Sequence, residues 1–269
     1  MTRQRRRPFP TRWPMTLIRC LLAVALVLPT FASAQPQPAA AALEPVPAWE
    51  PIATLAPFEG TYEAYYKGRA AGDATLALTP LAGNRWQVSL EVRGKRGFAG
   101  VLGLNLLQTT EFELHQGQFR PLRQHTERRG LFLGRKVEGV YDWQAGQARW
   151  QGDIDRKRRA PVALQPGDLS ALLINLAIMR DARPGAQLQY RFADVGRTRL
   201  HEYQAADSTA ITAVGELSYD ALQVRRTNAS AGDGMTLWLA SGVPTPIRIT
   251  QREDGEETVD LRLVQYQGD

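Results

Sequence analysis

The sequence has few cysteines and histidines, the residues that form disulfides or bind metal ions in small exported domains. Its 269 residues include one cysteine, Cys20, so no disulfide can form within the chain. The three histidines, at positions 115, 125 and 201, show none of the short spacings typical of zinc sites. The sequence therefore excludes a disulfide scaffold, and we predict no metal and no cofactor.

A recognisable catalytic motif is also lacking. Ser170 lies in "GDLSA" without the glycine on each side that forms a nucleophile elbow. Asp153 and Asp155 form a close carboxylate pair, which could do acid–base chemistry. Because a basic run follows them directly, we expect a solvated, charge-paired loop there. We therefore predict that the protein is not an enzyme.

No apolar run is long enough to cross a bilayer, and the most apolar stretch belongs to an N-terminal leader. The first 34 residues contain six arginines and no acidic residue, and they include the apolar run 20–28 and the triplet Ala-Ser-Ala at 32–34. A basic start, a short apolar run and a small-residue triplet are typical of a secretory signal peptide. We predict cleavage after Ala34, export to the periplasm and no integral membrane segment after cleavage.

Cleavage of that leader would remove the net positive charge of the chain. The chain has 33 Lys and Arg against 27 Asp and Glu, and six of the 33 lie in the leader, which leaves 27 of each sign. A balanced mature chain has no global electrostatic reason to bind nucleic acid, so no such partner is predicted.

The sequence does have segments in which apolar and polar residues alternate, with a period of two. In "RWQVSLEVR", residues 85–93, apolar side chains alternate with polar ones, as in a strand with one buried face. Similar segments are separated by short turn signals such as Val195-Gly196. Consecutive hairpins indicate an antiparallel meander. Residues 35–57 are rich in Pro and Ala and predict a flexible spacer, so we place one β-rich domain at 58–269.

One stretch has a helical period instead. Residues 169–181 follow Asp168, the expected N-cap, and end before "RPG" at 183–185. Their apolar side chains fall on two opposite faces, so the helix must be covered on more than one side. We predict a mainly β fold, a single antiparallel and strongly curved meander sheet forming a half-barrel or open barrel, with one internal apolar α-helix at about 169–181.

These features together resemble a known family. Tyr62, Tyr65 and Tyr66, the "GDLSALL" helix start, the following "RPG", and "TLWL" near "PIRI" are similar to the exported proteobacterial family called domain of unknown function 3108. The resemblance covers about residues 58–267. It implies an exported β-rich domain, similar in architecture to the periplasmic half-barrel carriers of lipoproteins, which have more than one helix. It brings no catalytic residues.

We expect a ligand cavity between the concave face of the sheet, the helix and residues 97–107, "GFAGVLGLNLL". Glycines interrupt the apolar residues of that segment, which predicts either a mobile apolar lip over the cavity or a bulged strand or short helical turn packed into the core. The residues expected to line the cavity are Phe98, Val101, Leu102, Leu104, Leu172, Leu173, Leu176, Met179, Tyr66 and Trp238.

The basic run Arg156, Lys157, Arg158 and Arg159 predicts contact with an anionic group, such as a lipid head group or an anionic envelope polymer. A solvated basic face is the alternative interpretation of the same residues.

Two functions fit this sequence best. The first is a periplasmic non-enzymatic binding or carrier domain for an apolar or amphipathic, lipid-like ligand in cell-envelope biogenesis. The second is a structural or adaptor protein of the envelope that binds another protein or an anionic polymer and has no ligand cavity. A hydrolase of envelope glycans is a third hypothesis, but no acid and base stand at a recognisable spacing.

Overall fold

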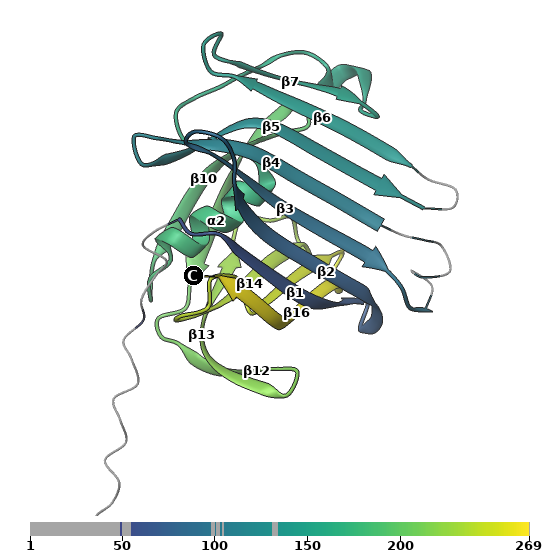
Figure 1. The fold of residues 1–269 in the computed structure, drawn as a ribbon, viewed down its shortest axis with the longest axis vertical. Helices are drawn as coiled ribbons and strands as arrows, with labels where there is room; N and C mark the ends of the chain where they lie inside the picture. The colour runs from purple at the N-terminus through teal and green to yellow at the C-terminus, as the bar shows by residue number, and fades with distance from the viewer. Residues whose placement is uncertain are drawn as a thin grey trace, which may run out of the picture. The chain divides into compact units, whose positions relative to one another are not determined.

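A computed structural model gives the fold (Figure 1). It describes residues 49, 55–97, 100, 103, 105–130 and 134–268. The chain divides into two compact units, and all described residues belong to the second, Val46–Asp269. The predicted signal peptide and most of the predicted spacer lie outside the described residues.

Alternation of buried and outward side chains builds the strands, as predicted. β1 (Phe58–Tyr66) buries Phe58, Tyr62 and Ala64, whereas Glu59 faces outward. A series of hairpins follows, with strands β2 (Arg69–Pro80), β3 (Arg85–Gly94), β4 (Asn105–His115), β5 (Gln118–Arg129), β6 (Arg135–Asp142) and β7 (Gln147–Gly152).

Short elements then lead into the helix and the second half of the sheet. They are the 3₁₀ helix η1 (Arg156–Arg158), β8 (Val162–Ala163), β9 (Asp168–Leu169) and α2 (Ala171–Asp181). The later strands are β10 (Gln187–Asp194), β11 (Arg197–Ala205), β12 (Ala210–Val214), β13 (Leu217–Arg226), β14 (Gly234–Ala240), β15 (Arg248–Glu253) and β16 (Glu256–Gly268).

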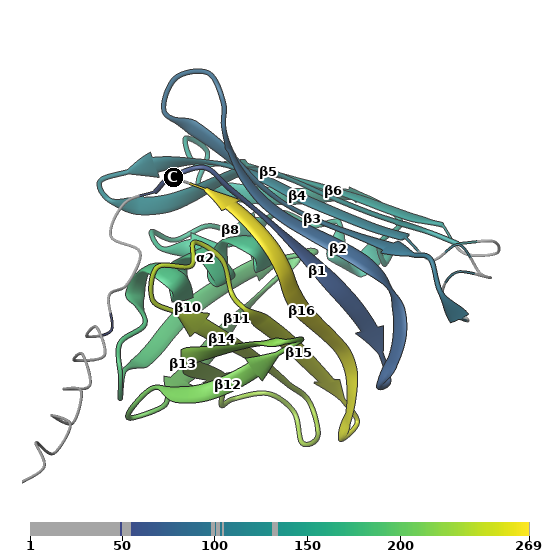
Figure 2. The same ribbon diagram turned by 60° about the horizontal axis from the view of Figure 1, so that its bottom comes forward.

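The described strands form one sheet of 16 strands that is not closed. Its order is β8-β7-β6-β5-β4-β3-β2-β1-β16-β15-β14-β13-β11-β10-β9, and β12 pairs with β13 outside this path. Neighbouring strands are antiparallel, except that β9 runs parallel to β10. The first and last strands pair at the middle of the order, so two arms extend from them and curve around α2 (Figure 2). The predicted half-barrel with an internal helix is confirmed.

Four of the hairpins have turns with the same backbone conformation. Both central residues have positive φ, as in the type I′ turns that match the twist of paired strands, at Lys67-Gly68, Gln116-Gly117, Val195-Gly196 and Asp254-Gly255. The turn predicted at Val195-Gly196 is one of them.

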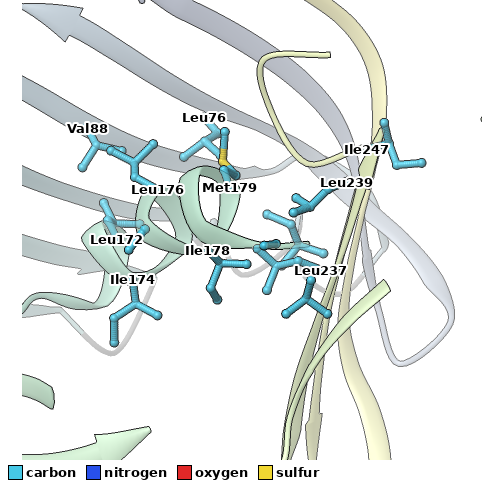
Figure 3. Packing of buried hydrophobic residues seen from close by; sticks show 14 of the residues in the cluster. Leu76, Val88, Leu172, Ile174, Leu176, Ile178, Met179, Leu237, Leu239 and Ile247 are labelled. Atoms are coloured by element: carbon cyan, nitrogen blue, oxygen red, sulfur yellow. The ribbon is translucent and has the colours of Figure 1, made fainter. Parts of the chain in front are cut away.

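Helix α2 is buried on opposite sides. Seven of its 11 residues are buried, and it contacts β10 as well as β3, β4 and β5. Figure 3 shows Leu176 and Met179 beside Leu76 and Val88 of the sheet, with Ile178 on the other side of the helix. Among the described residues, no helix is long and apolar enough to cross a membrane.

The predicted start of this helix was wrong by two residues. The N-cap is Ser170, whose Oγ accepts a hydrogen bond from the N–H of Leu173, and it also lies 2.9 Å from Thr110 Oγ1 on β4. Asp168 instead lies in β9, where it is fully buried and accepts from Arg191 Nη1 at 2.6 Å and from the N–H of Gln165. A buried carboxylate that is paired with an arginine is no longer available as a cap.

The two arms of the sheet also meet directly. The hydroxyl of Tyr141 on β6 donates to the carbonyl of Ala193 on β10 at 2.8 Å. Val137, Tyr141, Trp150 and Ala193 belong to a second, smaller core cluster at this place. The half-barrel is thus held together by side chains where its strands do not pair.

Candidate ligand cavity

A cavity of about 600 Å³ lies at the C-terminal end of α2. Both arms of the sheet, the helix and the segment before β1 supply its walls. Its apolar lining residues include Trp49, Leu55, Phe58, Leu78, Leu114, Phe119, Leu176, Met179, Leu239 and Val243.

The helix positions one wall through its own periodicity. Leu176 and Met179 are three residues apart, so they lie one above the other on the same face. Both are only 4 % exposed and line the cavity. The next residue, Arg180, is the charged side chain among the lining residues.

Arg180 combines a charged head with an apolar setting. Its Nε donates to Asp181 Oδ1 at 2.6 Å, its Nη1 donates to the carbonyl of Gly117 at 3.1 Å, and its guanidinium lies 4.5 Å from the ring centre of Phe119. The hydrogen bond to Asp181 raises the pKa of Arg180, so the group stays charged. The cavity therefore has hydrocarbon walls and one paired ion.

The loop between β14 and β15 forms a further wall, and Tyr62 fixes it. The Tyr62 hydroxyl lies 2.6 Å from Thr245 Oγ1 and donates to the carbonyl of Pro246 at 2.8 Å. Burial raises the pKa of Tyr62, so the phenol remains a hydrogen-bond donor. Tyr62 belongs to the motif that suggested the family, and its role is to hold the loop that lines the cavity.

Trp49 is a lining residue that sequence reasoning missed. It lies in the predicted flexible spacer, yet its indole Nε1 donates to the carbonyl of Ala182 at 3.0 Å, just after α2 ends. A tryptophan within a Pro- and Ala-rich stretch is the signal that could have found it, because large aromatic rings rarely stay in water.

The predicted lining residues separate into groups. Leu176 and Met179 line the cavity, whereas Leu172 and Leu173 are buried in the core near the start of the helix. Tyr66 ends β1 and is 50 % exposed. Trp238 is half-buried on β14, with the guanidinium of Arg248 5.0 Å from its ring centre.

Phe98, Val101, Leu102 and Leu104, also predicted to line the cavity, lie outside the described residues. Within the same segment, the N–H of Gly100 donates to the carbonyl of Arg96, four residues earlier, as in a helical turn.

The basic run lies on and beside η1. Arg156, Lys157 and Arg159 are exposed, whereas Arg158 is half-buried and lines a second, smaller pocket. Asp155 caps η1 by accepting from the N–H of Lys157.

The two carboxylates of the predicted pair bind different backbone groups. Asp153 Oδ2 accepts from the N–H of Lys136 on β6, whereas Asp155 Oδ1 accepts from Lys157 within its own turn. Both residues are exposed, as in the solvated loop that was expected, but the described bonds of their carboxylates go to backbone N–H groups and not to the basic side chains.

No histidine is among the described residues that line the cavity. His201 is 9 % exposed and stacks on Phe192 with ring centres 4.6 Å apart. Burial, together with the charges of Arg226 and Arg199, lowers its pKa to about 4. Within the described part of the chain, no three His, Cys, Asp or Glu side chains gather as metal ligands would.

Comparison with solved structures found matches at low sequence identity. A β-barrel-like protein of the domain of unknown function DUF1849 from Brucella abortus is 10 % identical, with a TM-score of 0.50 over 80 % of this chain and 98 % of that chain. A DUF1089 family protein from Pseudomonas aeruginosa is 13 % identical, with a TM-score of 0.34 over 65 % and 87 % of the two chains. No curated protein matched the sequence.

The likeness to the Brucella protein supports the barrel-like architecture and carries no activity with it. The family resemblance noted in the sequence has a direct test, because a family model can be matched to the chain residue by residue. The model described as protein of unknown function (DUF3108) matches residues 61–262, most of the described domain, and the chain belongs to this family.

Proposed function

We propose that this chain is a non-enzymatic binding or carrier domain of the periplasm, which holds an apolar or amphipathic, lipid-like ligand during cell-envelope biogenesis. The observation that carries the proposal is the cavity of about 600 Å³ with apolar walls at the end of α2. Ligand pockets range over roughly 300–1,000 Å³ and are mostly apolar with a few polar groups. The predicted signal peptide supports the periplasmic location.

Burial alone can retain such a ligand. Moving an acyl chain out of water contributes about 0.8 kcal/mol per methylene, so affinity needs no polar specificity along the chain. Arg180 and the hydroxyl of Thr245 are polar groups among the lining residues, and they could orient a polar head group. The mechanism is burial and release, without bond making or breaking.

The first test is whether the protein carries a ligand when purified. Residues 35–269 would be purified from a bacterial periplasm and measured by native and by denaturing mass spectrometry, followed by organic extraction. We expect an added mass in the native spectrum that extracts as a lipid or another amphiphile. A clean apo mass, together with no uptake of offered palmitate, would favour the adaptor hypothesis.

A matched pair of variants connects the ligand to this cavity. Ala240 lines the cavity at the end of β14, so Ala240→Phe fills part of it. Ala213 is exposed on β12, so Ala213→Phe adds the same ring outside. We expect palmitate binding to weaken at least tenfold in Ala240→Phe and to stay unchanged in Ala213→Phe, with circular dichroism showing that both variants fold. Equal binding by the two variants contradicts the assignment of this cavity.

A further inference from the structure

A second pocket, of about 210 Å³, is lined by four arginines. They are Arg128 of β5, Arg135 of β6, Arg158 of η1 and Arg197 of β11, and we call this site the arginine pocket. Asp194, Gln108 and Thr126 complete its polar lining, and Phe192 and two valines are its apolar part. The pocket brings together segments up to 89 positions apart in the chain, between Gln108 and Arg197.

The arginine pocket is separate from the apolar cavity. Both use the β4–β5 hairpin, but the cavity uses Leu114 and Phe119 beside the turn, whereas the arginine pocket uses Gln108 and Thr126, which pair farther along. Leu114 and Gln108 are six residues apart in one strand, which is roughly 20 Å at the usual rise of about 3.3 Å per residue. A small ligand in one site therefore does not touch a ligand in the other.

A close backbone approach brings two of the arginines together. Gly196, in the β10–β11 turn, lies so near η1 that a Cβ atom at this position would be 1.9 Å from the carbonyl oxygen of Arg158. Gly196 also has a φ of +71°, which glycine adopts without strain. The turn that ends in Arg197 is therefore packed directly against the turn that carries Arg158.

The described lining of this pocket has four arginines and one carboxylate, Asp194, so its positive charge is only partly neutralised. None of the four arginines forms an ion pair there, and Arg135 donates from Nε to the backbone carbonyl of Asp153. Burial and the charges of Arg199 and Arg158 lower the pKa of Arg197, whereas the charge of Asp194 raises it. Guanidinium groups that outnumber the carboxylates near them repel one another, and an anion between them offsets the repulsion.

Asp194 adds a second requirement for any ligand of this pocket, a hydrogen-bond donor. Its Oδ1 is buried and has no hydrogen-bond partner among the described residues. A buried oxygen without a donor is costly, and such groups are normally satisfied by a bound molecule or by water. A ligand that suits this pocket therefore carries negative charge for the arginines and an O–H donor for Asp194.

We propose that the arginine pocket binds a phosphate group that retains an O–H, as inorganic phosphate does near neutral pH and as a phosphomonoester does only below its second pKa of about 6. The arginine forks donate to the phosphate oxygens, and the phosphate O–H donates to Asp194 Oδ1. Sulfate has the same shape but no proton near neutral pH, so it meets the Asp194 carboxylate as a repelling charge. This site is independent of the proposed lipid-like ligand.

Calorimetric titration of the mature chain with sodium phosphate and with sodium sulfate, at constant ionic strength set by chloride, tests the proposal. We expect saturable phosphate binding at least tenfold tighter than sulfate binding. Arg128→Gln and Arg197→Gln are expected to weaken phosphate binding at least tenfold. Arg156→Gln is the matched control, because Arg156 carries the same charge on η1 and does not line the pocket.

Asp194→Asn tests the selectivity. An asparagine amide can donate to either anion, so we expect the preference for phosphate over sulfate to fall to less than threefold in this variant. If wild-type protein shows no saturable phosphate binding, or if Arg156→Gln weakens it as much as Arg128→Gln, the proposal is overturned. Thermal unfolding of each variant checks that its fold is retained.

Two further experiments identify the source of the phosphate and separate this proposal from the proposed function. Vesicles of phosphatidylcholine containing phosphatidic acid test a lipid source. Binding that needs Arg128 and is displaced by inorganic phosphate supports the lipid, whereas phosphate binding without vesicle binding supports a soluble phosphate. Phosphate binding is expected to be unchanged in Ala240→Phe, so failure of the apolar cavity proposal leaves this result intact.

Discussion

Single buried polar groups position the wall of the apolar cavity. Tyr62 is 1 % exposed, and its hydroxyl connects β1 to the β14–β15 loop through Thr245 and Pro246. A phenylalanine at this position would keep the ring but leave the carbonyl of Pro246 without this donor. The net value of such a bond is modest, but a buried group that loses its partner is expensive.

Tyr62→Phe is therefore expected to lower the free energy of unfolding by about 1–2 kcal/mol. Urea denaturation measures this change. Tyr66→Phe is the control, because Tyr66 is half exposed at the end of the same strand, and we expect a change within about 0.5 kcal/mol. Equal effects of the two substitutions would show that the Tyr62 hydroxyl does not support the loop.

His201 gives the protein a pH-dependent stability. Its pKa is about 4 in the folded protein and near 6.5 in the unfolded chain, so between these values the unfolded state binds more protons. The free energy of unfolding is then expected to fall as pH falls from about 6.5 to about 4, by at most about 3 kcal/mol from this residue.

The corresponding measurement is urea denaturation at several pH values in this range. His201→Phe retains a ring that can stack on Phe192 and removes the titrating group, so its stability is expected to fall less steeply over the same pH range. If both proteins lose stability in parallel, another group is responsible for the pH dependence.

At the scale of elements, α2 is held at both ends by polar contacts. Ser170 caps its start and contacts Thr110 of β4, and the carbonyl of Ala182, just after its end, accepts from Trp49. The nearby pair of Asp168 and Arg191 fixes the chain as it enters the helix. The "GDLS" motif thus has a structural role, which is to hold the start of the helix in place inside the half-barrel.

Ser170→Ala removes both the cap and the partner of Thr110. We expect the free energy of unfolding to fall by about 1–2 kcal/mol, at the upper end for a lost cap because Ser170 is fully buried. Chemical denaturation followed by circular dichroism measures the loss. Ser218→Ala, on the exposed side of β13, is expected to change it by less than about 0.5 kcal/mol; a similar loss there would contradict the capping role.

At the scale of the whole molecule, the helix and its neighbours form one core that both arms share. Ile178 and Leu173 of α2 belong to the same buried cluster as Leu76 of β2 and Leu237 of β14. Because the arms meet through this cluster and through Tyr141 and Ala193, neither arm has a separate core of comparable size.

Unfolding of the domain is therefore expected to be a single cooperative transition. Leu173 is fully buried, so Leu173→Ala should lower the free energy of unfolding by about 2–5 kcal/mol. Tryptophan fluorescence and far-ultraviolet circular dichroism should report the same shifted midpoint. Two separate midpoints in this variant would show that the arms unfold independently.

Much of the fold was predictable because it depends on local patterns. Strand alternation, glycine turns and a helix apolar on opposite faces each leave a periodic signature, and together they imply a curved sheet around a helix. The start of the helix was misplaced because Asp168 and Ser170 are both residues that cap helices well. The arginine that pairs with Asp168 lies 23 residues later, so the sequence near the helix does not show this pair.

The candidate sites were less predictable. Leu176 and Met179 follow from helical spacing, but Trp49 reaches the cavity from a segment that carries no periodic pattern. The arginine pocket depends on Gly196 meeting η1, and no local pattern records that contact.

The sequence by itself determined the strands, the turns, the helix and the family, because these depend on residues close together in the chain. The tertiary structure decided where the apolar residues leave a cavity and which arginines gather around Asp194. Both sites join residues from distant strands, and the distance between such residues is set by how the sheet curves. That curvature is a property of all the strands together, so no single segment encodes it.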